Sequence, residues 1–216
     1  MKDKLTYYDS KEERLNIITH GIGFLLSIVA LVLLIVYASR YGTVWHITSF
    51  AIFGASLIVL YAASTFYHYA KNPDLRIKLN ILDHAAIYVL IAGTYTPFTM
   101  VVLKGWIGWT IFGVSWGLAI IGIVFKIFYF GRFDRISTIA YVLMGWVVIF
   151  AIKPLMDELP TKGLIWLFAG GLAYTFGAFL YSRKNLRFNH ALFHVFVLIG
   201  SFCHFMAVFF YVLPAR

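Results

Sequence analysis

The sequence predicts an all-α integral membrane protein, a bundle of seven transmembrane helices. Of its 216 residues, 62% are hydrophobic and only 12% are charged, a balance that does not keep a soluble domain of this length in solution. Seven apolar runs are each near the roughly 20 helical residues that cross a bilayer, and short loops with turn-forming residues separate them. The runs are 16–37, 45–69, 81–102, 106–128, 137–152, 164–181 and 189–212, the fifth being the shortest.

The distribution of positive charge predicts the orientation of the bundle. Most of the 18 Lys and Arg residues fall in the N-terminal segment and in alternate loops, and positively charged loops are retained in the cytoplasm during insertion. The N-terminus is therefore predicted inside and the C-terminus outside. We expect a cytoplasmic N-terminal segment at 1–15, without a cleaved targeting peptide, and one transmembrane domain at 16–213.

The net charge of +9 is explained by this asymmetry and by contact with anionic lipid headgroups. Nucleic-acid binding is not indicated, because the basic residues are scattered among short loops next to the membrane. The composition and topology thus favour a resident of the cell membrane whose partners are lipids.

Three pairs of polar residues interrupt the apolar runs. In the predicted topology, all three pairs lie in the inner leaflet although they come from different helices. Ionisable side chains at membrane depth are costly, so they usually face the bundle interior, where they pair or carry out chemistry. The pairs are Ser64 with His68, Asp83 with His84, and His190 with His194.

The spacing of the histidines predicts a metal site. His190 and His194 are four residues apart, which places both on one face of a helix. With His68 from a facing helix and water in the fourth position, they make the tetrahedral arrangement of a catalytic zinc site. Asp83 would balance part of the ion's charge and act as general base for the water. Ser64, one turn from His68, would orient the carboxylate, a ligand or the water.

The remaining histidines and the cysteine are expected to have supporting roles. His84 either supports the site or contacts a neighbouring helix, and His20 is a helix cap or an interhelical hydrogen-bond partner. His46 lies near the outer interface. His204 is near mid-membrane, and haem is not indicated because no histidine pair on a second helix matches it. Cys203, the single cysteine, is expected to be a buried packing residue.

Several segments together carry a resemblance to a known family. They are Glu12-Glu13-Arg14-Leu15-Asn16 with Thr19-His20-Gly21, Ser64-x-x-x-His68, Leu82-Asp83-His84-Ala85-Ala86-Ile87-Tyr88 through Ile91-Ala92-Gly93-Thr94-Tyr95-Thr96-Pro97, and His190-x-x-x-His194. In order and spacing they resemble the bacterial hemolysin III family, over almost the whole chain. That family belongs with the progestin and adipoQ receptors, which include the adiponectin receptors, and is more distantly similar to alkaline ceramidases.

The resemblance implies a seven-helix bundle, N-terminus inside, with zinc as its cofactor near the cytoplasmic leaflet. It assigns the metal to His68, His190 and His194. It makes Asp83 the partner of the water in the open position and Ser64 the serine of the second-helix motif.

The leading functional hypothesis is a zinc-dependent hydrolase of a lipid amide. Its expected partner is a membrane lipid, either a ceramide-like molecule or a free fatty acid, with the acyl chain between the helices. One alternative is a pore-forming hemolysin, although seven hydrophobic helices with a strong inside bias describe a resident of the producer's own membrane. The other is a sensor or regulator of membrane lipid state or energetics, in which the metal is structural.

Overall fold

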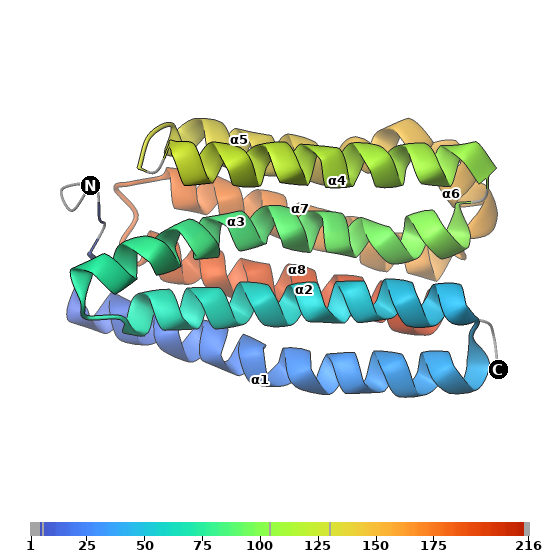
Figure 1. Cartoon of the computed structure of the whole chain (residues 1–216), viewed down its shortest axis with the longest axis horizontal. Coiled ribbons are helices and arrows are strands. Elements are labelled where there is room, and N and C mark those ends of the chain that lie inside the picture. Colours follow the sequence, from blue (N-terminus) through green and yellow to red (C-terminus); the bar gives the residue numbers. More distant parts are fainter. Residues whose placement is uncertain (1–4, 6, 104, 130, 214–216) are drawn as a thin grey trace.

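The computed structural model describes residues 5, 7–103, 105–129 and 131–213. It shows long helices lying side by side along one axis (Figure 1). The elements are α1 (Ser10–Tyr41), α2 (Val44–Tyr69), α3 (Pro73–Pro97), the π-helical turn η2 (Phe98–Val102), α4 (Gly105–Phe128), α5 (Asp134–Gly145), the 3-10 turn η3 (Val147–Ala151), α6 (Ile152–Glu158), α7 (Thr161–Ser182) and α8 (Asn189–Tyr211).

The predicted fold class is confirmed. The described residues form no strand, and they contain seven helical spans long and apolar enough to cross a membrane. In this arrangement α3 continues into η2 as one span, and α5, η3 and α6 together make another. Helices α1 and α8 begin at the same end of the bundle, and α8 ends at the opposite end (Figure 1). Which end faces the cytoplasm stays a prediction.

Small residues let neighbouring helices approach closely. The most extensive packing is between α1 and α2, α2 and α3, and α7 and α8, and α1 also touches α8. A Cβ atom on Gly54 of α2 would collide with Leu31 of α1, and one on Gly23 of α1 would collide with the ring of Tyr61. Close backbone approach of this kind replaces the hydrophobic effect as a driving force for association in lipid.

Helix α1 begins well before the apolar run at 16–37. The Asp9 carboxylate caps it, accepting hydrogen bonds from the backbone N–H of Lys11 at 2.8 Å and of Glu12 at 3.1 Å. These N–H groups, that of Glu12 foremost, hold the pKa of the exposed Asp9 carboxyl below its ordinary value. Glu12 and Glu13 lie in the first turn, where the helix dipole favours negative charge. Both carboxylates are thereby held on a helix.

Helix α3 also begins before its apolar run at 81–102. Asn72 caps it, its Oδ1 atom accepting hydrogen bonds from the N–H groups of Asp74 at 2.9 Å and Leu75 at 3.1 Å. Pro73 follows at the first helical position. A backbone N–H at this position would have no acceptor within the helix, so the lack of an N–H in proline costs no hydrogen bond. The early start places Arg76 inside α3, buried at the same end of the bundle as the first turn of α1.

The fifth span is interrupted between α5 and η3. The Tyr95 hydroxyl from α3 donates to the Gly145 carbonyl at 2.7 Å and accepts from the Val148 N–H at 2.8 Å. The hydroxyl thus satisfies backbone groups that the interruption frees, as a polar backbone in lipid requires. The sequence places a single helix at 137–152, and the structure corrects this to a longer, broken span that ends at Glu158.

Candidate metal centre

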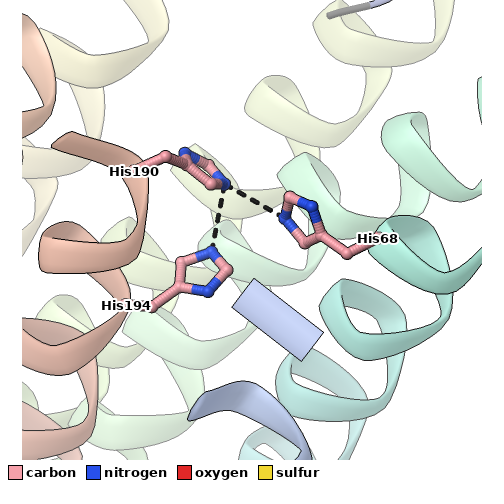
Figure 2. A group of neighbouring side chains, drawn as sticks. All are labelled: His68, His190 and His194. Carbon is pink, nitrogen blue, oxygen red and sulfur yellow. Dashed lines mark hydrogen bonds between the residues drawn. The ribbon is translucent and has the colours of Figure 1, made fainter. Parts of the chain in front are cut away.

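Three buried imidazoles converge where α2 ends and α8 begins. The Nε2 atom of His190 lies 3.1 Å from Nε2 of His68 and 3.1 Å from Nε2 of His194 (Figure 2). One nitrogen from each ring lies within 4.8 Å of the other two. The structure therefore brings together the three histidines that the sequence singles out, and they form a group that can hold a metal ion.

Two of the three separations between these nitrogens fit a zinc ion. Two ligand atoms about 2.0–2.1 Å from a tetrahedral zinc lie roughly 3.3 Å apart, close to the observed 3.1 Å. Unprotonated nitrogens that face each other at this distance repel, and a shared cation removes the repulsion. Three imidazole nitrogens are a donor set that tetrahedral zinc accepts, and two of these histidines, His190 and His194, line a cavity.

The outer nitrogen of His68 contacts a carboxylate. Its Nδ1 atom lies 2.6 Å from Oε2 of Glu13, and the Asn16 amide nitrogen lies 3.4 Å from the same Nδ1. An ionised carboxylate only accepts hydrogen bonds, so the ring proton is on Nδ1. The lone pair of His68 Nε2 is then free to face the other two histidines.

The outer nitrogen of His194 faces a hydroxyl group. The Thr19 hydroxyl donates to the Leu15 carbonyl at 2.8 Å, and its oxygen lies 3.4 Å from His194 Nδ1. The imidazole is therefore the donor in this contact, which again leaves Nε2 unprotonated. On its flat side, His194 stacks on His20, with ring centroids 3.5 Å apart.

His190 is held through its backbone and its ring face. Its N–H donates to Oε1 of Glu12 at 3.1 Å, and the ring stacks on Tyr8 with centroids 4.6 Å apart. Burial raises the pKa of the Tyr8 hydroxyl, so that residue stays neutral. The segment that precedes and opens α1 thus lies directly over the histidine cluster.

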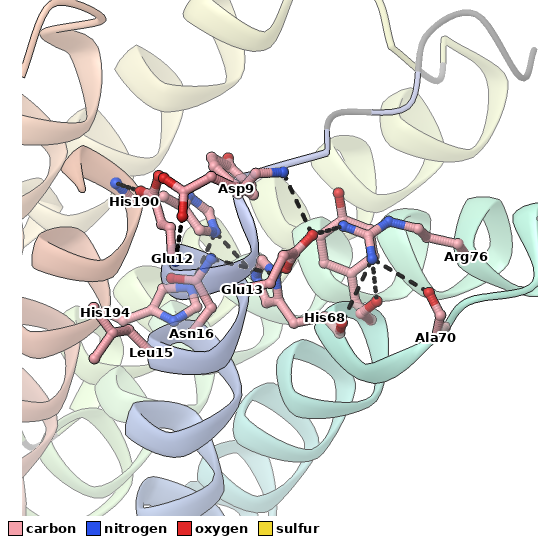
Figure 3. A network of polar contacts seen from close by, with 12 residues as sticks. Asp9, Glu12, Glu13, Leu15, Asn16, His68, Ala70, Arg76, His190 and His194 are labelled. Carbon is pink, nitrogen blue, oxygen red and sulfur yellow. Dashed lines mark hydrogen bonds and ion pairs between the residues drawn. The ribbon is translucent and has the colours of Figure 1, made fainter. Parts of the chain in front are cut away.

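An arginine from α3 completes the polar network at this end (Figure 3). The Arg76 guanidinium pairs with Oε1 of Glu13 and lies over the Tyr7 and Tyr67 rings. It also donates to backbone carbonyls where α2 ends, at 3.3 Å for Ala70. Side chains from α1, α2, α3 and α8 therefore meet around the three histidines.

Asp83 and Ser64 line the cavity that the histidine cluster borders. His190, His194 and His20 contribute to the same lining. Both side chains are buried, and Ser64 Oγ makes no hydrogen bond of normal geometry with the described residues. Asp83 lies outside the three-residue ligand group. The arrangement is compatible with a carboxylate beside the metal, and the catalytic roles of both residues stay predictions.

The cavity extends from this polar end through the bundle. Its lining is mostly apolar and comes from α3, α5, η3, α6, α7 and α8. It reaches Leu103 and Leu155, which lie near the opposite end of the bundle, and it passes His204 and Tyr174 on the way. The cavity is therefore long and mostly apolar, and Ser64, Asp83, His190 and His194 line one end of it.

A family comparison identifies the group of proteins to which the chain belongs. The family model described as "Haemolysin-III related" matches residues 8–205. The chain belongs to this family. The match includes all three histidines of the cluster, the first turn of α1 and Asp83.

Relatives of this haemolysin-III-related protein occur in bacteria and animals. It is 49% identical to "Hemolysin-3" of Bacillus cereus over 216 residues, covering 99% of each chain. It is 51% identical to "Hemolysin-3 homolog" of Bacillus subtilis over 201 residues, 93% of this chain and 94% of the relative. "Monocyte to macrophage differentiation factor" of Homo sapiens is 27% identical over 173 residues, 77% of this chain and 71% of the relative. With its seven spans, the haemolysin-III-related protein is a multi-pass cell membrane protein.

The other histidines of the haemolysin-III-related protein lie outside the ligand group. His84 contacts the Asn80 carbonyl of its own helix at 2.8 Å. His46 is buried, and its Nδ1 accepts the Thr43 N–H at 3.1 Å where α2 begins. His204 donates to the Leu167 carbonyl at 3.1 Å. None of the three belongs to the cluster that can hold a metal ion. The free cysteine is buried, as expected.

Sequence reasoning missed Glu12, Glu13 and Arg76 in this haemolysin-III-related protein. The sequence does contain a pattern that points to Glu12. Glu12, Asn16 and His20 recur four residues apart and therefore share one helix face. All three are buried. The many charges of the first residues mask this pattern, because such a charged segment is typical of a region ahead of the membrane span.

Proposed function

We propose that the protein is a zinc-dependent hydrolase of a membrane lipid amide, such as a ceramide-like molecule. The observation that supports it is the position of the histidine cluster at the polar end of an apolar cavity whose lining includes Asp83 and Ser64. Ligand atoms, a candidate base and space for an acyl chain thus occur together.

His68, His190 and His194 would hold the zinc ion through their Nε2 atoms. Bound there, zinc would act as a Lewis acid on a carbonyl and activate a water molecule. Imidazole ligands also suit copper, iron and nickel. Three neutral imidazole ligands favour zinc, because they leave one position of a tetrahedral site open for reaction.

Asp83 would act as the general base and acid. Its carboxylate accepts the proton of the attacking water and later gives it to the leaving amine, so that one group serves both steps. Asp83 also supplies the negative charge that three neutral imidazoles lack. Ser64 would orient this carboxylate, since its hydroxyl lines the same cavity.

The apolar part of the cavity would hold the acyl chain. Residues such as Ile91, Phe168 and Val197 make up this lining, while polar groups gather at the end that the histidines border. If the N-terminus is inside, as the charge distribution predicts, the scissile bond would lie in the inner leaflet. That is the depth at which the head of a membrane lipid is linked to its chain.

The test is turnover of a ceramide-like amide by purified, zinc-loaded protein in detergent. Asp83→Asn is expected to lower turnover by about 10²–10⁴-fold, the usual contribution of a general base, while zinc content stays unchanged. Asp74→Asn is the matched control, because Asp74 is an exposed aspartate on the same helix. Unchanged turnover in Asp83→Asn, or no turnover by wild type, would contradict the hydrolase proposal.

One observation favours a second candidate, a metal-stabilised sensor or regulator. The histidines join α2 to α8, and Glu13 and Arg76 tie in α1 and α3, so an ion here would cross-link four helices. In that case Asp83→Asn would leave the physiological phenotype intact. His190→Ala would instead release the ion and lower the thermal stability of the bundle.

A further inference from the structure

We propose that Glu13 is a positioning residue of the metal centre, which holds the His68 ring with Nε2 directed at the ion, and that Arg76 in turn holds Glu13. The inference rests on the proposed metal site and adds two residues to it. Neither residue is a ligand in the histidine group, and Glu13 reaches the group from α1 rather than from a ligand-bearing helix.

The contact between Glu13 and His68 carries the first step. The two side chains come from residues 55 positions apart in sequence, and their contact is 2.6 Å long with the His68 side chain fully buried. A carboxylate at Nδ1 fixes both the tautomer and the orientation of the ring. It also strengthens Nε2 as a donor, because negative charge on one side of an imidazole raises the basicity of the other nitrogen.

Arg76 carries the second step. Its guanidinium is 3% exposed and pairs with the oxygen of Glu13 that does not face His68. One carboxylate oxygen of Glu13 thus contacts His68 and the other contacts Arg76. The two contacts together restrict rotation of the Glu13 side chain. Arg76 also compensates the charge of Glu13, so Asp83 remains the carboxylate that can balance the charge of the ion.

The preceding residue supplies a comparison within the same turn. Glu12 has the same side chain, lies in the same turn of α1 and also reaches the cluster, but it accepts a hydrogen bond from the backbone N–H of His190. Its carboxylate therefore anchors the start of α8 without touching a nitrogen of any ligand ring. If Glu13 positions the ring, replacing Glu13 should affect zinc binding more than replacing Glu12. If only negative charge near the ion matters, the two replacements should have similar effects.

The experiment measures zinc affinity of the purified full-length chain by competition with a chelator. Glu13→Gln is expected to weaken zinc binding about 10–100-fold, the usual effect of losing such a partner. It should also alter the visible spectrum of the cobalt-substituted protein. Glu158→Gln, at an exposed glutamate of α6, should stay near wild type in both measurements. Glu12→Gln should weaken zinc binding less than Glu13→Gln does, and Glu13→Asp should recover part of the loss. Equal effects of Glu12→Gln and Glu13→Gln would overturn the proposal.

A double variant separates positioning from simple charge compensation. If Glu13 only neutralises buried Arg76, then Glu13→Gln with Arg76→Gln should return zinc affinity to the wild-type value, which would overturn the proposal. If Glu13 positions His68, affinity should stay low in the double variant, with the helix content of the bundle retained by circular dichroism. Wild type that binds no zinc would overturn the proposed metal site as well, whereas wild type that binds zinc with no effect of Glu13→Gln would overturn only this inference.

Discussion

The ring of His20 in α1 lies flat against that of His194 in α8, with centroids 3.5 Å apart and planes inclined by 12°. The rings of Tyr61 and His20 meet in an edge-to-face arrangement, with centroids 5.1 Å apart. Neither ring nitrogen of His20 has a hydrogen-bond partner among the described residues. The contribution of His20 is therefore that of a flat, buried ring that supports the ring of His194.

Replacing His20 by phenylalanine should preserve this support. Phenylalanine keeps a flat ring and removes two buried nitrogens that lack partners, so thermal stability and zinc affinity should stay close to wild type. His20→Ala should leave a cavity beside His194 and lower the free energy of unfolding by about 2–4 kcal/mol. Thermal unfolding in detergent measures both variants. Equal destabilisation by the two substitutions would show that the ring nitrogens have a function.

Removal of any one ligand should abolish tight metal binding. His68→Ala, His190→Ala and His194→Ala each leave two imidazoles, too few for a stable tetrahedral site. His204→Ala is the matched control, because this buried histidine lies on α8 about 15 Å from His194 at the rise of a helix. Elemental analysis should find stoichiometric zinc in wild type and His204→Ala only. Full metal content in all four variants would place the ion elsewhere.

Loss of the Tyr95 hydroxyl should destabilise the interrupted fifth span. Tyr95→Phe leaves the Gly145 carbonyl and the Val148 N–H without this shared partner. A buried polar group that loses its partner costs about 1–3 kcal/mol, and the thermal midpoint should fall accordingly. Tyr69→Phe serves as control because Tyr69 is 69% exposed. An unchanged midpoint in Tyr95→Phe would mean that the interruption is satisfied in another way.

Acidification should loosen the first turn of α1. The pKa of Asp9 is lowered in the folded protein from its ordinary value of 3.8, so its capping contribution is present above that value. The contribution is lost as the pH falls through the folded pKa, because only the ionised carboxylate caps fully. Hydrogen exchange in the peptide that contains Glu12 and Glu13, corrected for intrinsic rates, measures the loss. Asp9→Ala should show at neutral pH the loosening that wild type shows only in acid.

Hydropathy and spacing were sufficient to predict the spans and the cluster of three histidines. A run of apolar residues indicates which part of a helix crosses the lipid. The rise per residue then gives the position of each polar side chain along that helix. Alternating spans bring equal depths together, which is why His68, His190 and His194 were found from sequence alone. Hydropathy does not mark where a helix begins, because capping groups such as Asp9 and Asn72 decide that.

By itself the sequence determined the membrane fold and the grouping of three histidines. Only the tertiary structure decided that Glu13 contacts His68, that Arg76 pairs with Glu13 and that His20 stacks on His194. The physical reason is that depth follows from position along one helix, whereas the rotation of each helix and the choice of its neighbours follow from side-chain packing across the whole bundle. The partners of a metal ligand are therefore a property of the assembled helices.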